Sequence, residues 1–193
     1  LRCIKKPIIG AVNGVAAGAG ANIALACDIV VAHEKVSFIQ AFSLIGLVPD
    51  SAGTFFLPRL IGFQKAQALA MLGDKISAEE AEKMGMIYKS VPLEEFEETI
   101  SKLAIKLANM PTKALGLIKE LFNKSMTNTL EDQLALESKL QIEAVTLKYT
   151  DEECKWVKPM TYQEEVDWLI SHKKRNKFIC DLTLSRCTNT LVL

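Results

Sequence analysis

Hydrophobic residues in the first part of the chain fall into short runs that small or polar residues separate. Short apolar runs without strict alternation are typical of strands that are buried on both faces. This pattern predicts strands at residues 8–13, 29–32, 36–40 and 86–91. A loop over residues 14–20 contains three glycines, and a helix rich in Ala and Leu follows over residues 19–26.

Later in the chain, apolar residues recur at the spacing of helices. Pro58 limits residues 55–60 to a short helical turn, because proline disrupts a helix interior. Ser77 and Glu80 form a capping box that begins a helix ending at Gly85. Further helices are predicted at residues 63–72, 93–109, 111–122 and 130–145. Strands followed by helices predict an α/β fold with a helical C-terminal part.

Three segments with different patterns suggest the domain organisation. Residues 1–92 form a predicted α/β core, residues 93–145 a helical C-terminal part, and residues 146–193 a divergent segment without a clear period. An amphipathic helix at 162–172 is the one element suggested in the last segment. Because the chain begins with Leu and enters a strand almost at once, we expect it to be a fragment.

Composition is that of a soluble globular protein and narrows the choice of partners. The 193 residues are 49% hydrophobic and 24% charged, which excludes a disordered chain. The 23 basic and 23 acidic residues cancel, so no overall field attracts nucleic acid. Five cysteines without a CxxC pair and two distant histidines argue against a metal site and favour a reducing, cytoplasmic location.

A membrane helix is an alternative interpretation of the glycine-rich stretch. Two overlapping GxxxG steps run from Gly10 to Gly18 inside an uncharged segment at residues 7–27. Asparagines at positions 13 and 22 and the weak hydrophobicity of Gly and Ala argue against a membrane span. We therefore expect no membrane contact.

The same stretch carries the first candidate for chemistry. Gly18-Ala19-Gly20 begins like a dinucleotide-binding fingerprint, but Ile23 stands where the third glycine belongs. Main-chain N–H groups where a loop enters a helix can form an oxyanion hole. Tight packing of strand against helix explains the small residues equally well, so both interpretations stay open.

Asp50, in a Pro-Asp-Ser-Ala-Gly turn, is the second candidate. It is either a plain helix N-cap or turn acceptor, or a general acid/base beside the oxyanion hole. Asp28 and Glu34 are expected to be solvated turn residues, and His33 is placed in a polar turn without a catalytic role. Three methionines are predicted to fill the core: Met71, Met84 and Met86.

Three long motifs resemble the enoyl-CoA hydratase/isomerase (crotonase) family. They read KPIIGAVNGVAAGAGANIALACDIVVA, SFIQAFSLIGLVPDSAGTFFLPRLIG and GDKISAEEAEKMGMI. The resemblance covers about Lys5 to Ala144. Within the family, the first two motifs look most like the ring-epoxide isomerases of phenylacetate degradation.

The resemblance implies a fold and a set of site residues. The fold is a crotonase-like core of ββα repeats whose opening strands, with one oxyanion loop, would precede Leu1. Ala19 supplies an oxyanion N–H and Asp50 shuttles the proton. Substrate-binding positions implied near the first motif are Gly18, Ala21 and Phe42, and basic or aromatic residues of the closing helix implied to contact CoA are Lys173, Lys174 and Phe178.

The resemblance also implies an activity. Hydratases of the family carry glutamates where this chain has Asn22 and Phe42, so water addition is disfavoured and an acyl-CoA isomerase acting through a thioester enolate is expected. An inactive paralogue serving as a structural subunit and an enoyl-CoA hydratase are the alternatives. The resemblance further implies a homotrimer or hexamer and no cofactor, because CoA is part of the substrate.

Overall fold

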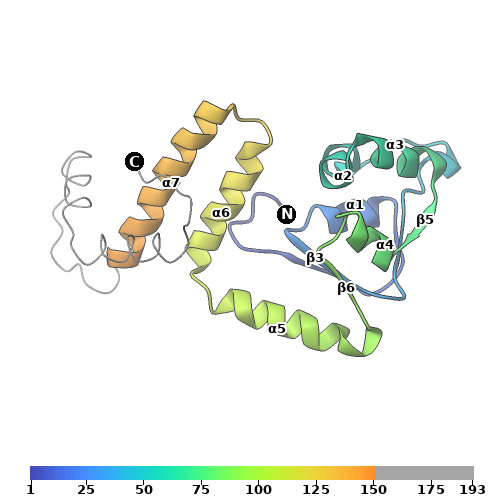
Figure 1. Cartoon of the computed structure of the whole chain (residues 1–193), viewed down its shortest axis with the longest axis horizontal. Helices are drawn as coiled ribbons and strands as arrows, with labels where there is room; N and C mark the ends of the chain where they lie inside the picture. Colours follow the sequence, from blue (N-terminus) through green and yellow to red (C-terminus); the bar gives the residue numbers. More distant parts are fainter. Residues whose placement is uncertain (151–193) are drawn as a thin grey trace, which may run out of the picture. The chain divides into compact units, whose positions relative to one another are not determined.

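The computed structural model describes residues 1–150, with side chains through residue 145. Residues 1–144 form one compact unit, and a second unit begins at Val145. Figure 1 shows the elements in chain order. The division into segments 1–92, 93–145 and 146–193 stays a prediction.

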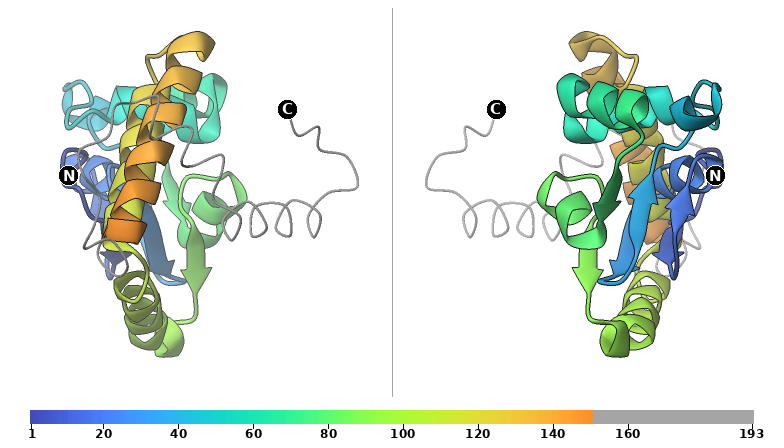
Figure 2. Two further views of the ribbon diagram at one scale, coloured as in Figure 1. Left: turned by 90° about the vertical axis from the view of Figure 1, so that its left-hand side faces the viewer. Right: turned by 90° about the vertical axis from the view of Figure 1, so that its right-hand side faces the viewer.

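Two small sheets carry the α/β part. In the first sheet, β1 (Ile9–Val12), β3 (Ile29–His33) and β6 (Lys89–Val91) are parallel, in the order β1-β3-β6. Figure 2 shows these strands from two further sides. Their positions confirm three of the predicted strands.

The second sheet holds β2 (Ala16–Ala17), β4 (Ser37–Ile39) and β5 (Lys75–Ser77). β2 is parallel to β4, and β5 runs antiparallel to β4. Of these strands only β4 was predicted. β2 lies inside the predicted glycine loop, and β5 is a three-residue segment that the hydrophobic pattern does not reveal.

Two ββα repeats follow one another along the chain. The first is β1, β2 and α1 (Ala19–Leu25), and the second is β3, β4 and α2 (Gly53–Ile61). Equivalent strands of the two repeats pair in parallel, β1 with β3 and β2 with β4. The predicted α/β fold of ββα repeats is therefore confirmed.

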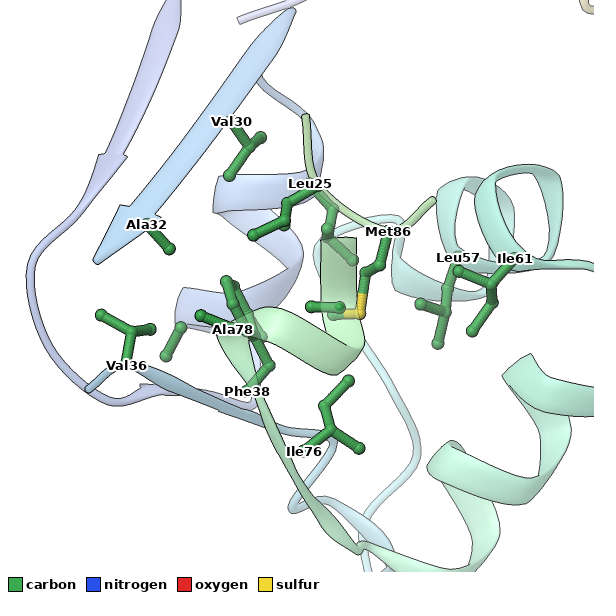
Figure 3. Close-up of a cluster of buried hydrophobic side chains, with 14 of the residues drawn as sticks. Leu25, Val30, Ala32, Val36, Phe38, Leu57, Ile61, Ile76, Ala78 and Met86 are labelled. Atoms are coloured by element: carbon green, nitrogen blue, oxygen red, sulfur yellow. The ribbon is translucent and has the colours of Figure 1, made fainter. Parts of the chain in front are cut away.

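Side chains of β3 alternate between two apolar layers, which explains its uninterrupted apolar sequence. Val30 and Ala32 join the larger cluster on the α1 side, and Val31 joins Phe96 of α5 (Phe96–Ala108) on the other. Figure 3 shows the larger cluster, to which α1, β3, β4, α2, β5 and α4 (Ala78–Lys83) contribute. α1 is thus fixed on the sheet by its own buried face.

The predicted helices are present. In addition to those already named they are α3 (Phe63–Leu72), α6 (Thr112–Ser125) and α7 (Leu130–Thr150), with short 3₁₀ turns η1 (Ser43–Ile45) and η2 (Leu93–Glu95). α6 and α7 lie side by side (Figure 1), and the Gln133 side chain donates to the Leu121 carbonyl at 3.3 Å.

Pro58 does not limit its segment to one turn, so that prediction was wrong. α2 runs through Pro58 to Ile61. Phe56, Leu57 and Ile61 are buried on one side of α2, and their burial offsets the hydrogen bond that proline cannot donate.

The glycine-rich stretch is not a membrane helix, because it forms β1, β2 and the seven-residue α1. In the part of the chain that the structure describes, none of the helices has the length and hydrophobicity to cross a bilayer.

The predicted capping box is confirmed at α4 and supports a stability prediction. The Ser77 hydroxyl accepts from the Glu80 N–H at 3.2 Å, and the Glu80 carboxylate accepts from the Ser77 N–H at 2.9 Å. Ser77→Ala is expected to lower the free energy of unfolding by about 1 kcal/mol, measured by urea denaturation. Ser101→Ala, at an exposed position within α5, is the control and should change little.

This capping effect should depend on pH. Hydrogen bonds from the Ser77 N–H and then from its hydroxyl hold the pKa of Glu80 below its ordinary value. A lowered folded-state pKa contributes stability above the unfolded-state pKa, and that stability is lost as the pH falls through the folded-state pKa. The deficit of Ser77→Ala should therefore shrink in acid, and a deficit that is constant with pH would contradict this account.

Candidate active site

The N-terminus of α1 presents main-chain donors in a fixed position. Gly18 precedes the helix with φ +52°, a conformation that favours glycine, and its N–H donates to the Ile39 carbonyl at 2.9 Å. Ala19 is the first helical residue, so its N–H has no acceptor within α1, and none is found elsewhere among residues 1–150. This N–H is available to an anionic oxygen.

The Phe42 side chain lies on one side of the Ala19 N–H donor. It follows β4 and is 6% exposed, and a Cβ added to Gly18 would lie 3.5 Å from its ring. The ring therefore packs directly against the backbone that precedes Ala19. Its predicted role as an apolar wall for substrate stays a prediction.

Asp50 lies in a strained turn just before α2. Ser51 and Ala52 both adopt left-handed conformations, with φ of 50° and 62°, which are costly for residues with a Cβ. The Asp50 carbonyl accepts from the Gly53 N–H at 2.9 Å. Ala52 is the N-cap of α2, and no described side chain caps that helix, so the plain-cap interpretation of Asp50 is wrong.

The Asp50 side chain is exposed to solvent. Among the residues whose side chains are described, none donates a hydrogen bond to its carboxylate or forms an ion pair with it. A carboxylate without a partner can accept a proton from a bound molecule.

Asn22 connects the two candidate groups. It lies on α1, three residues after Ala19, and is fully buried. Its Nδ2 donates to the Asp50 carbonyl at 2.9 Å, and its Oδ1 accepts from Gln40 Nε2 at 2.9 Å. The structure thus joins the Ala19 helix to the Asp50 turn through one side chain.

An apolar cavity of about 490 Å³, which we call the α2–α3 cavity, opens beside the Asp50 turn. Pro49 and Gly53, on either side of Asp50, are in its wall. Most other wall residues come from the segment after β4 and from the facing sides of α2 and α3, and they include Leu47, Val48, Leu57, Phe63, Ala66 and Met71. Met71 is 68% exposed and was wrongly predicted to fill the core, whereas Met84 and Met86 pack in it as predicted.

Cys27 and His33, which carry potentially reactive side chains, both pack against other residues. Burial, helped by the Asp28 carboxylate, raises the pKa of the Cys27 thiol, which favours the unreactive protonated form. His33 is not in a polar turn as predicted, because it ends β3, is 7% exposed and packs edge-on against Phe96. No cluster of metal-ligating side chains occurs within the described residues.

The expectation that Asp28 is a solvated turn residue was wrong. Its carboxylate accepts from the Lys119 ammonium at 2.7 Å and from the Ile8 N–H at 2.8 Å, and it pairs with Arg2 at 3.6 Å. Glu34, by contrast, is exposed as predicted.

The other predicted site residues are placed as follows. Ala21 is fully buried as a whole residue in the larger apolar cluster, and its predicted contact with substrate stays a prediction. Lys173, Lys174 and Phe178 lie outside the described residues. Sequence reasoning assigned no role to Asn22 beyond what the resemblance implied, although a lone amide in an apolar helix must find hydrogen-bond partners when buried.

Comparisons with known proteins agree with this architecture. The fold of ββα repeats is that of crotonase-like proteins. The enoyl-CoA hydratase/isomerase family model matches residues 1–158, and the chain belongs to this family.

Two curated relatives are named for different activities. The chain is 51% identical over 138 residues to 1,2-epoxyphenylacetyl-CoA isomerase of Escherichia coli, covering 72% of this chain and 53% of that protein. It is 47% identical over 135 residues to a probable enoyl-CoA hydratase of Rhodobacter capsulatus, covering 70% and 52%. The chain therefore spans about half the length of the curated relatives it matches.

A solved relative shows what a similar fold binds. A protein from Thermobifida fusca, crystallised with acetoacetyl-CoA, is 31% identical, with a TM-score of 0.69 over 72% of this chain and 55% of that one.

Proposed function

We propose that this chain carries the proton-transfer half of an acyl-CoA isomerase. The observation that supports this most directly is the unpaired Asp50 carboxylate on a turn tied to the helix that begins with the free Ala19 N–H. The thioester carbonyl would accept from Ala19, and the acyl group would lie toward the α2–α3 cavity. A homotrimer or hexamer is part of the same proposal.

The reaction is a proton relocation. The Asp50 carboxylate removes a proton made acidic by the thioester, and the electron pair moves onto the thioester oxygen to form an enolate. The Ala19 N–H stabilises that oxygen, and a second main-chain donor, which the resemblance assigns to an N-terminal loop, would complete the pair. Asp50 then returns the proton to another carbon, so no proton is gained or lost overall.

Asn22 favours isomerisation over hydration. Hydration requires a group that activates water, and the resemblance places hydratase glutamates at positions 22 and 42. Here the Asn22 amide is fully buried with both polar atoms bonded, and Phe42 is apolar. Neither side chain can act as a base toward water. The Escherichia coli relative makes a ring-epoxide of phenylacetyl-CoA the first substrate to test.

The test is an assay of three reactions with the chain alone and with a chimera that adds the opening strands of the Escherichia coli relative before Leu1. We expect the chimera to isomerise 3-enoyl-CoA or epoxidised phenylacetyl-CoA and to hydrate 2-enoyl-CoA at least tenfold more slowly. Faster hydration than isomerisation would establish the hydratase alternative. Absence of all three reactions in a folded chimera would favour the structural subunit.

A further inference from the structure

The turn that carries Asp50 does not hold its shape through its own residues. Two consecutive left-handed residues, Ser51 and Ala52, follow Asp50, and both have a Cβ. Within the turn, a single main-chain hydrogen bond, from the Gly53 N–H to the Asp50 carbonyl, closes it. Such a conformation persists only where neighbouring groups enforce it.

Asn22 is the neighbour that enforces it. Its Nδ2 donates to the Asp50 carbonyl at 2.9 Å, and Gly53 lies so close that an added Cβ would overlap the Asn22 carboxamide. Asn22 is fully buried, so no exposed water competes for this hydrogen bond. The Asn22 side chain therefore holds the turn in its left-handed conformation.

The orientation of this amide is determined by its partners. A main-chain carbonyl only accepts, so the Asn22 NH₂ group must face Asp50 and its oxygen must face Gln40. Gln40, 3% exposed, then donates through Nε2 to that oxygen. Gln40 thereby fixes Asn22, and Asn22 fixes the Asp50 turn.

We propose that Asn22 is a positioning residue that sets the place of the Asp50 carboxylate relative to the Ala19 N–H. Both groups are tied to α1, because Ala19 is its first residue and the Asn22 side chain, one turn later, donates to the carbonyl of Asp50. The effect of Asn22 on catalysis rests on the proposed function, whereas its effect on the conformation of the Asp50 turn does not.

The substitution Asn22→Asp tests this with almost no change in size. Its carboxylate faces the Asp50 carbonyl with an acceptor in place of a donor, so the turn loses its support. When protonated, the introduced carboxyl regains an O–H donor, so its effect should reverse in acid. The elements that contact α1 most are β1, β2 and α2, and their one titratable side chain is Arg59 of α2, which donates to the Phe55 carbonyl. β3, which shares the larger apolar cluster with α1, ends in His33, whose ring packs against Phe96. The other titratable groups near position 22 are Cys27 and Asp28, which follow α1 in the chain, and Asp50 in the turn itself. Asp28 is paired with Lys119.

Activity is measured in the chimera with 3-enoyl-CoA at several pH values. Asn22→Asp should lower kcat roughly tenfold at pH 8 with KM little changed, because a misplaced base lowers the rate of the chemical step. The ratio of variant to reference kcat should rise as the pH falls, because the protonated carboxyl at position 22 regains a donor toward the Asp50 carbonyl. Asn109→Asp makes the same change at an exposed residue and should leave the ratio near one.

A second measurement does not depend on activity. Amide hydrogen exchange in the peptide over residues 47–57 should quicken in Asn22→Asp at pH 8, because the Gly53 N–H loses its fixed acceptor. Gln40→Met, which removes the orienting donor without adding charge, should quicken the same exchange and serves if Asn22→Asp does not fold. Unchanged exchange in a folded variant, or a kcat deficit that is constant with pH, would overturn the proposal. If the reference and Asp50→Asn chimeras turn over equally, the proposed function fails, and the exchange measurement still decides the role of Asn22.

Discussion

Asp50→Asn is expected to lower isomerase kcat by about 10²–10⁴-fold, the range typical of losing a general acid/base. The amide is nearly the same size but cannot take up the proton that isomerisation relocates. The main-chain carbonyl that Asn22 and Gly53 hold is unchanged by the substitution. Binding of the acyl-CoA should persist, so KM should change far less than kcat.

Stability separates this effect from a structural one. The Asp50 carboxylate has no partner among the described side chains, so Asp50→Asn should leave Tm unchanged. Asp74→Asn, at an exposed carboxylate between α3 and β5, is the matched control and should retain full activity. The proton-shuttle role would be refuted by an Asp50→Asn chimera that turns over 3-enoyl-CoA at the reference rate.

The hydrophobic pattern and short motifs of the sequence predicted those helices and strands that are determined by their own residues. β3 was recognisable because both of its faces are buried, and α4 because Ser77 and Glu80 satisfy each other's donors within four residues. β2 could not be recognised in the same way. Its two alanines have little strand preference, and they form a strand because β4, more than twenty residues later, pairs with them.

The candidate site likewise has parts that the sequence predicted and parts that it did not. Asp50 was singled out by its turn and Ala19 by the family resemblance. The structure places them on segments that Asn22 joins, but their catalytic roles stay predictions. The hydrogen bonds from Asn22 to Asp50 and from Gln40 to Asn22 span 28 and 18 residues, so no local pattern reveals them. Left-handed conformations at Ser51 and Ala52 were equally hidden, because sequence would assign such angles to Gly53.

Asp28, which was wrongly expected to be solvated, helps to hold the first strand in place. Its partner Lys119 lies 91 residues later, on α6. Lys119 is 8% exposed, and besides Asp28 its ammonium donates to the Leu1 and Lys6 carbonyls at 3.0 and 3.2 Å. All three ammonium protons thus have acceptors, and the segment before β1 is fastened to α6.

Lys119→Ala is accordingly expected to lower the free energy of unfolding by about 3 kcal/mol, because it leaves the Asp28 carboxylate largely buried without its main partner. Urea denaturation followed by circular dichroism measures the difference. Lys83→Ala is the control: Lys83 pairs with Glu79 at the same 2.7 Å, but both side chains are 72% exposed, so its loss should have little effect.

A double substitution distinguishes a buried charge from lost packing. Lys119→Met keeps most of the side-chain volume, so it should still destabilise while Asp28 is present. Adding Asp28→Asn should recover much of the loss, because the uncompensated carboxylate is then gone. If Lys119→Met alone is as stable as the reference, the ion pair contributes nothing, and the attachment of the first strand to α6 rests on other contacts, such as the Asn123 amide on the Arg2 carbonyl.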